Sequence, residues 1–114
     1  MIQENLYALL SGFVGGRMYP NMAPGAVEKP YLVYTRVASQ PEITLNSKVP
    51  INNDRFQIDC FDNTYSGVQT LAKQVNQAML DWAIQNVPLL EQDRFDSDAN
   101  LHRVILDFSV WHYF

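Results

Sequence analysis

Cysteine is almost missing from this chain, because Cys60 is the only one among its 114 residues. A single cysteine excludes an intramolecular disulfide framework and any metal site built from several thiolates. Proteins without disulfides are typical of reducing compartments. We therefore expect a protein that is not exported.

Charged residues are also scarce, at 18% of the chain against an average of about 25%. Eight basic and twelve acidic residues give a net charge of −4, and no cluster of Lys or Arg occurs. Specific nucleic-acid binding is not expected, because it needs clustered basic side chains to neutralise phosphates. No apolar run approaches a bilayer span and the N-terminus lacks a basic leader, so we expect a soluble protein without a membrane partner.

The apolar residues that are present predict two helices in a single domain, 1–114. Apolar side chains at helical spacing predict the first helix over Ile2–Val14, followed by Gly15 and Gly16 where helices commonly end. The second helix is expected to begin at Ser66 as its N-cap. Its apolar stripe consists of Val68, Leu71, Ala72, Val75, Ala78, Met79, Trp82 and Ala83.

Four further segments have the alternation or the β-branched and aromatic content of strands. They are Tyr31–Val37, Asp54–Asp62, Val87–Phe95 and Leu101–Phe114. The order α-β-β-α-β-β predicts an α+β fold, with a four-stranded, mainly antiparallel sheet and two helices packed on one face. Between the first two strands, Ser39 to Asn53 is expected to form a long polar loop with a function, because loops of this length are uncommon in compact domains.

The C-terminus is aromatic, since the chain ends on Trp111, His112, Tyr113 and Phe114. Terminal residues stay ordered only where something packs on them. We therefore expect this end to lie inside the sheet or against a partner. Such an end favours a protein that assembles over an enzyme.

Few residues suggest reaction chemistry. Cys60 with His102 or His112 would form a thiolate pair, but Cys60 shares a strand face with apolar residues, which favours a buried, inert thiol. Asp96, Asp98, Asn100 and Asp107 have spacing similar to that of a calcium loop, but Leu101 stands where such a loop needs glycine. We predict no catalytic residue, no metal site and no cofactor.

Three arginines, Arg36, Arg55 and Arg103, fall on predicted strands. One interpretation is a solvated sheet face on which Asp59 and Asp107 are their cross-strand partners. The other is contact with a neighbouring subunit. The residues alone leave both open.

Four segments have a characteristic order along the chain. They are Arg17–Pro20, Pro30–Tyr34, Phe56–Phe61 followed by Tyr65 and the long helix, and His102–Trp111. Taken together, they resemble the tail-completion or tail-terminator proteins of long-tailed bacteriophages, which include small head-to-tail joining proteins. The resemblance spans nearly the whole chain.

The resemblance implies a structural virion protein that caps the tail tube as a homo-oligomeric ring, commonly hexameric, and helps to join tail to head. Its implied partners are itself, the tail-tube protein and a neck or head-completion protein, with DNA passing through the ring. It would be found in the host cytoplasm during assembly and then in the tail or neck of the virion. The candidate subunit or tube interface is Arg36, Gln40, Asn46, Lys48, Asn52, Asn53 and Arg55.

Two alternatives remain at this point. The first is a small ferredoxin-like ligand-binding domain or enzyme that uses an aromatic sheet face. The residues of that face would be Tyr31, Tyr34, Phe61, Trp111 and His112. The second is a neck or head-completion protein with a different docking partner.

Overall fold

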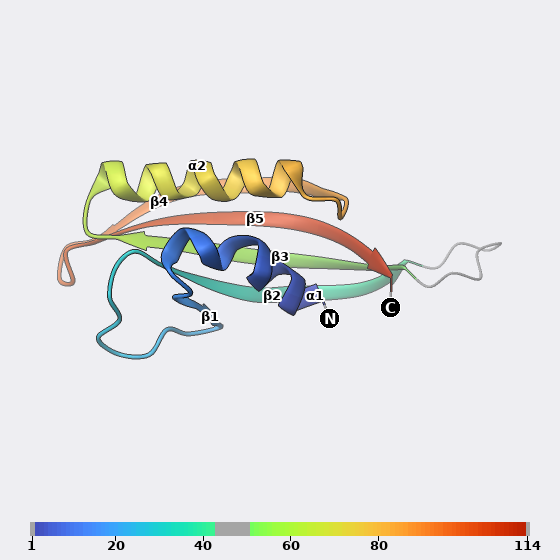
Figure 1. The fold of residues 1–114 in the computed structure, drawn as a ribbon, viewed down its shortest axis with the longest axis horizontal. Helices are drawn as coiled ribbons and strands as arrows, with labels where there is room; N and C mark the ends of the chain where they lie inside the picture. The colour runs from blue at the N-terminus through green and yellow to red at the C-terminus, as the bar shows by residue number, and fades with distance from the viewer. Residues whose placement is uncertain (1, 43–50, 114) are drawn as a thin grey trace.

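The structure of the protein, a computed structural model, describes residues 2–42 and 51–113. Its elements are α1 (Ile2–Leu10), the 3-10 helix η1 (Ser11–Val14), β1 (Met18–Pro20), β2 (Tyr31–Glu42), β3 (Ile51–Asp62), α2 (Tyr65–Asp81), β4 (Asn86–Asp96) and β5 (Leu101–Tyr113) (Figure 1). The strands form one sheet in the order β1-β2-β3-β5-β4. The α+β class is confirmed, and both helices lie on the same side of the sheet.

The expected four strands are joined by a fifth, β1, which pairs parallel with β2 and makes the sheet mixed. Met18–Pro20 is too short to show alternation, so sequence periodicity could not reveal it. The first helix is also divided, because α1 ends at Leu10 and η1 continues to Val14. Gly15 then ends the helical segment in the left-handed region, at φ 60°.

The predicted loop from Ser39 to Asn53 is wrong at both of its ends, and its middle, residues 43–50, lies outside the described residues. Residues 39–42 continue β2 and residues 51–53 begin β3, and the two strands pair as far as Glu42 opposite Ile51. Pro41 is accommodated because β1 pairs with β2 only at Leu32–Tyr34, so this part of β2 is a sheet edge, where a strand tolerates proline. A β-bulge lies in β2 between Arg36 and Ala38.

Helix α2 begins earlier than predicted. Thr64, not Ser66, is its N-cap, and the Thr64 hydroxyl accepts a hydrogen bond of 3.1 Å from the Gly67 amide. The helix ends at Asp81, where Trp82 turns to an extended conformation. Of the predicted stripe, Val68, Leu71, Ala72, Val75 and Met79 are buried, whereas Ala83 lies beyond the helix and is exposed.

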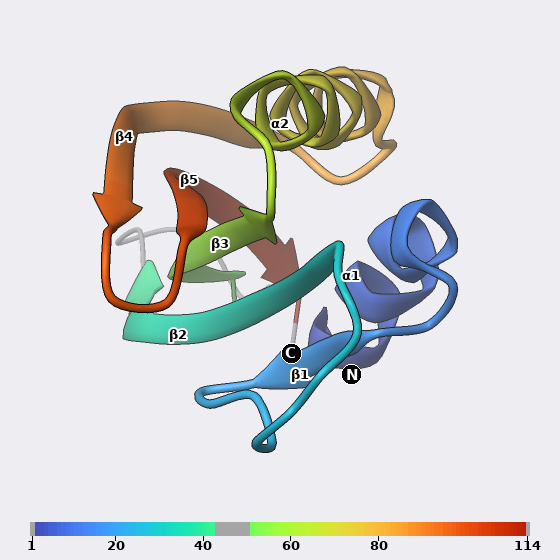
Figure 2. The ribbon, with the colours of Figure 1, turned by 90° about the vertical axis from the view of Figure 1, so that its left-hand side faces the viewer.

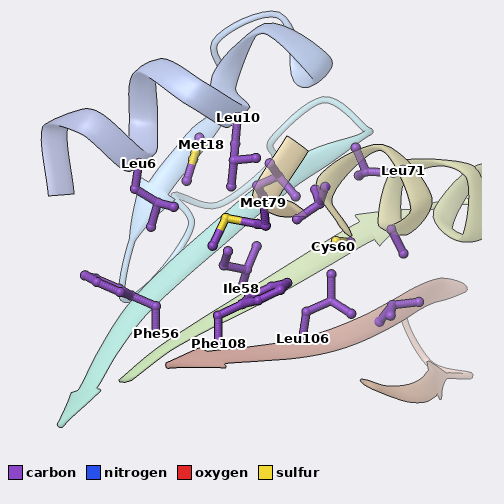
Figure 3. Packing of buried hydrophobic residues seen from close by; sticks show 14 of the residues in the cluster. Leu6, Leu10, Met18, Phe56, Ile58, Cys60, Leu71, Met79, Leu106 and Phe108 are labelled. Carbon is purple, nitrogen blue, oxygen red and sulfur yellow. The ribbon is translucent and has the colours of Figure 1, made fainter. Parts of the chain in front are cut away.

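One apolar core fills the space between the helices and the sheet (Figure 3). Viewed along the strands, α1 and η1 lie toward β1 and β2, whereas α2 lies over β3 and β5 (Figure 2). Phe56, Ile58 and Cys60 point from β3 into this core, as their alternation predicted. At the C-terminal end Val110 is buried and Trp111 and His112 are half-buried, so the expected packing of this end is confirmed as far as His112.

Candidate functional site

The candidate interface residues lie toward one end of the sheet, where β2 and β3 form a hairpin. Gln40 is exposed on β2, opposite Asn53 of β3. The Asn53 side-chain amide donates a 2.7 Å hydrogen bond to the Ser109 hydroxyl of β5, and Asn52 pairs in register with His112. Asn46 and Lys48 lie outside the described residues. The hairpin is thus tied to β5 near its end.

Arg36 belongs to a polar cluster on the helix side of the sheet. It stands opposite Phe56, and its Nη1 lies 3.9 Å from Oδ2 of Asp54, which is fully buried. His112 Nε2 lies 2.8 Å from the same oxygen, and its Nδ1 lies 3.2 Å from the carbonyl oxygen of Tyr113. Both ring nitrogens therefore lie within hydrogen-bond distance of an oxygen, and the tautomer of the ring decides which nitrogen donates. Asp54 Oδ1 has no hydrogen-bond partner within the described ranges.

A hollow of about 760 Å³ opens beside this cluster. Its lining comes from the start of α1, the connection between α2 and β4, the middle of β2, the start of β3 and the end of β5. The lining residues are Ile2, Gln3, Asn5, Arg36, Ile51, Ala83, Ile84, Gln85, Trp111, His112 and Tyr113. The hollow combines apolar walls with the half-exposed guanidinium of Arg36 at its edge.

Arg55 lies on the opposite, outer face of the sheet. Its Nη2 is 2.6 Å from Oδ2 of Asp107, and Arg103 Nη2 is 2.8 Å from Oδ2 of Asp59. Asp59 and Asp107 are buried although α1, η1 and α2 pack on the other face. The prediction of cross-strand ion pairs is confirmed for Arg55 and Arg103, but Arg36 approaches Asp54 instead.

The five aromatic or imidazole residues of the ligand-binding alternative do not share one face. Tyr31 stacks on Phe61 on the outer face, with ring centroids 4.7 Å apart. Burial raises the pKa of the Tyr31 phenol, and the positive charge of Arg103 partly offsets this rise. Tyr34 instead packs against the core on the helix side, where His112 also lies. The predicted single aromatic surface is therefore wrong, because alternation along a strand sends neighbouring residues to opposite faces.

The thiol and the acidic turn show no arrangement for chemistry. Burial and the charges of Asp59 and Glu91 raise the pKa of the Cys60 thiol, so it stays protonated at neutral pH. Asp96 accepts hydrogen bonds from the backbone amides of Asp98 and Ala99, as in a turn, whereas Asp107 is far along β5 beside Arg55.

Across residues 2–42 and 51–113 no group of three His, Cys, Asp or Glu side chains is arranged to hold a metal ion. In the same ranges no helix has the length and apolarity to cross a membrane.

Sequence reasoning identified β4 as a strand but missed its exposure. Residues 87–96 are all exposed, and β4 pairs only with β5 among the described strands. Large apolar side chains on β4 and at the end of α2 reach solvent, and these residues are Leu80, Val87, Leu89, Leu90 and Phe95. The signal in the sequence was the lack of alternation in Val87–Leu90, since a half-buried strand alternates.

Comparisons with known proteins give a fold and a family. No curated protein sequence matches the chain. Among solved structures, the chain is similar to one from the "Virion of native gene transfer agent (GTA) particle", with a TM-score of 0.65 and 17% identity over 96% of this chain and 92% of the other. At this identity the likeness concerns the fold. The sequence pattern of the family described as "Tail completion protein gp17" matches residues 4–113. The chain therefore belongs to this family of phage tail completion proteins, which are structural components of the virion tail.

Proposed function

We propose that this protein caps the phage tail tube as a homo-oligomeric ring and helps to join the tail to the head. The observation that carries the proposal is the family match over residues 4–113. The similar fold in a gene transfer agent particle supports it, because that particle is a virion. The proposed partners are further copies of the chain, the tail-tube protein and a neck or head-completion protein. Assembly would take place in the host cytoplasm, and DNA would pass through the ring without specific binding.

The architecture supports a ring for a geometric reason. A ring needs two different surfaces on each subunit, because its contacts are head-to-tail and close by rotation. The sheet offers two unlike edges: β4 on one side, and on the other β2, which β1 covers only at Leu32–Tyr34. Free strand edges are covered or protected in stable proteins. Lateral contact between copies would cover both edges.

The hairpin end is proposed to contact the tube or an adjacent subunit. Gln40, Asn52 and Asn53 lie near its described end, with Arg36 and Arg55 at its base on opposite faces. Asn46 and Lys48 remain proposed contacts. The side-chain hydrogen bonds of Asn53 and Asp54 to β5 would hold this end in place. Less conformational entropy would then be lost when the hairpin end contacts a partner.

The first experiment measures native mass, by light scattering or mass spectrometry, across a concentration series with and without the cognate tail-tube protein. We expect one closed oligomer, formed alone or induced by the tube protein. A chain that stays monomeric and does not respond to the tube protein contradicts the proposal. That result would favour ligand binding, for which the hollow beside Arg36 is the supporting feature.

A matched pair of turn replacements tests the hairpin. Because Glu42 pairs with Ile51, residues 43–50 can be replaced by Asn-Gly, a favoured two-residue hairpin turn. The control replaces residues 97–100 in the same way, since Asp96 pairs with Leu101. We expect the first variant to lose tail attachment or infectivity in a complementation assay and the control to keep both. If the first variant assembles and infects as the parent does, the hairpin end does not make the proposed contact with the tube or an adjacent subunit.

A further inference from the structure

The hollow beside Arg36 has the properties of a binding site. Its volume of about 760 Å³ falls within the range of ligand pockets, about 300–1,000 Å³. The start of α1 and the connection from α2 to β4 form its walls on the helix side of the sheet, and Arg36 and His112 project from the sheet on that side. Apolar walls with a few convergent polar groups are typical of such sites. The hollow is therefore a candidate site for a ligand or a partner segment.

The walls of the hollow are uncharged. Ile2 and Ile84 contribute apolar side chains, and both also pack with the core, which holds them in place. Gln3, Asn5 and Gln85 are polar lining residues without charge. An apolar side chain of a partner can therefore be buried here without leaving a buried charge unpaired.

The charges that line the hollow have one sign. Arg36 is a cation, and His112 is a cation when it is protonated. Within residues 2–42 and 51–113 no Asp or Glu is among the lining residues, and Glu4 of α1 is outside this set. The nearby Asp54 is fully buried and contacts both basic side chains. The hollow therefore attracts a negatively charged group.

Most of the hydrogen-bonding capacity of Arg36 is unused. His112 engages the Asp54 carboxylate more closely, because its Nε2 lies 2.8 Å from Oδ2 whereas Arg36 Nη1 lies 3.9 Å from that oxygen. The longer distance is not a hydrogen bond, and Arg36 has no other ion pair within the described part of the chain. Its side chain is 47% exposed. A guanidinium with free N–H donors can bind a carboxylate through two parallel hydrogen bonds.

The hollow opens at the end of the molecule where the hairpin of β2 and β3 lies. Ile51, the first residue of β3, is one of its lining residues. The start of α1 and the end of β5 lie at the same end (Figure 1). In the proposed ring, neighbouring copies meet through the edges of the sheet, so the ends of the strands face other proteins of the tail. This position therefore favours an occupant from the tail over a neighbouring copy.

We propose that the hollow binds a segment of the tail-tube protein in which a carboxylate side chain stands next to an apolar one. The carboxylate lies on the Arg36 guanidinium, and the apolar side chain packs between Ile2 and Ile84. The inference rests on the proposed function and names the chemistry of the contact with the tube. An arginine within an otherwise apolar contact is typical of the residues that dominate a protein interface.

A probe peptide tests the hollow on the isolated chain. The probe is Leu-Glu, acetylated and amidated so that the glutamate is its only carboxylate, and the control peptide is Leu-Gln with the same ends. In an NMR titration of backbone amides, we expect Leu-Glu to shift the signals of Gln3, Ile84 and His112. It should bind at least about fivefold more tightly than Leu-Gln. A lack of saturable shifts at these positions, or equal affinities, would overturn the proposal.

Two arginine variants give the matched comparison. Arg36→Gln should bind both peptides equally, because it lacks the guanidinium. Arg94→Gln changes an exposed arginine of β4 outside the hollow and should keep the preference for Leu-Glu. A preference that persists in Arg36→Gln, or disappears in Arg94→Gln, contradicts the assignment of the carboxylate to Arg36.

A third variant, Gln3→Glu, leaves the contact of Arg36 with Asp54 in place. An acidic residue in the first turn of a helix is favourable, so this variant should fold as the parent does. The new carboxylate in the lining should weaken the binding of Leu-Glu and leave that of Leu-Gln unchanged. If Leu-Glu binds to Gln3→Glu as tightly as to the parent, the carboxylate does not enter this hollow.

Binding of the cognate tail-tube protein separates this inference from the proposed function. We expect Arg36→Gln to bind the tube protein at least about fivefold more weakly than the parent, with an unchanged circular dichroism spectrum. Equal binding overturns the contact and keeps the proposed ring. A variant that fails to form the ring but binds the tube protein normally places a neighbouring copy in the hollow, which also overturns the inference. A parent that stays monomeric and ignores the tube protein contradicts the proposed function, and with it the tube protein as occupant.

Discussion

Asp107 is a residue whose environment decides its energetic role. It is buried on the outer face of the sheet, and its Oδ2 accepts from Arg55 while its Oδ1 has no partner within the described ranges. A buried carboxylate keeps its charge only when a cation or hydrogen-bond donors compensate the lost hydration. The Arg55 guanidinium provides that compensation from a half-exposed position. Removal of the arginine therefore costs more than the loss of an ordinary surface ion pair.

We predict that Arg55→Met lowers the free energy of unfolding by about 1–3 kcal/mol, because it leaves a buried charge without its partner. Urea unfolding followed by circular dichroism measures the change. Arg94→Met is the control, since Arg94 is exposed on β4, and it should stay within about 0.5 kcal/mol of the parent. Combining Arg55→Met with Asp107→Asn should recover part of the loss. If Arg55→Met lowers the free energy of unfolding no more than Arg94→Met does, the ion pair of Arg55 with Asp107 does not stabilise the fold.

The Cys60 thiol gives a second prediction at this scale. Its raised pKa means that the folded state favours the protonated thiol, so its contribution to stability is fully present below the unfolded pKa of about 8.5 and is lost as the pH rises above that value. At pH 8 we expect a thiol reagent such as DTNB to label native protein only as fast as the protein unfolds, with labelling faster in urea. The free energy of unfolding of Cys60→Ala should fall less steeply above a pH of about 8.5 than that of the parent, because this variant has no thiol to titrate. Rapid stoichiometric labelling of the folded chain would contradict the burial.

At the scale of elements, the start of α2 depends on a glycine. The Gly67 amide donates to the Thr64 hydroxyl, and a Cβ on Gly67 would lie 2.7 Å from that oxygen and would also collide with the Asp62 carboxylate. Alanine is otherwise the better helix former by about 1 kcal/mol. Here the collision would displace the N-cap, so the usual gain is not available.

We therefore expect Gly67→Ala to lower the free energy of unfolding by about 1 kcal/mol, the typical loss of a side-chain N-cap. Gly12→Ala is the matched control, because a Cβ there meets nothing within 4 Å. That control should be neutral or stabilising by about 0.5 kcal/mol. Thermal or urea unfolding of both variants gives the comparison. A stabilising effect at Gly67 would mean that the capping bond contributes little.

At the scale of the whole molecule, stability is unevenly distributed across the sheet. β3 and β5 lie at its centre and face the core, whereas β4 is an edge strand with every residue from 87 to 96 exposed. Local opening requires less free energy where few apolar groups are buried. In hydrogen exchange on the isolated chain, we predict slow exchange for β3, β5 and α2 and fast exchange for β4. Equal protection of β4 and β3 in the monomer would contradict this gradient.

Much of the fold was predictable because its signals are local. The stripe of Val68, Leu71, Val75 and Met79 identified α2, and the alternation through Phe56, Ile58 and Cys60 identified the central strand and its buried face. The cross-strand pairs of Arg55 and Arg103 followed from the same alternation. Elements that depend on distant partners were missed or misjudged. β1 exists because Met18–Pro20 meets β2, and residues 39–42 are a strand because residues 51–54 lie beside them.

The candidate site was less predictable than the fold for the same reason. The loop from Ser39 to Asn53 was expected to contact the tube or an adjacent subunit, with Arg36 and Arg55 together at its base. The structure instead places Arg36 by the buried Asp54 on the helix side and Arg55 by Asp107 on the outer face. Strand pairing separates them, because each residue's face is set by its partner in register. The exposed β4 surface was likewise not visible, since exposure depends on which strands lie at the edges.

By itself, the sequence determined the α+β class, both helices, the four longer strands and the buried thiol, because apolar periodicity and turn residues act within a few positions along the chain. The order of the segments along the chain also indicated the family of the protein. Only the tertiary structure decided the mixed five-stranded order, the extension of β2 and β3 into residues 39–42 and 51–53, the buried carboxylates of the outer face and the exposed edge at β4. These features depend on contacts between residues far apart in sequence, and such contacts form only when the whole core is assembled.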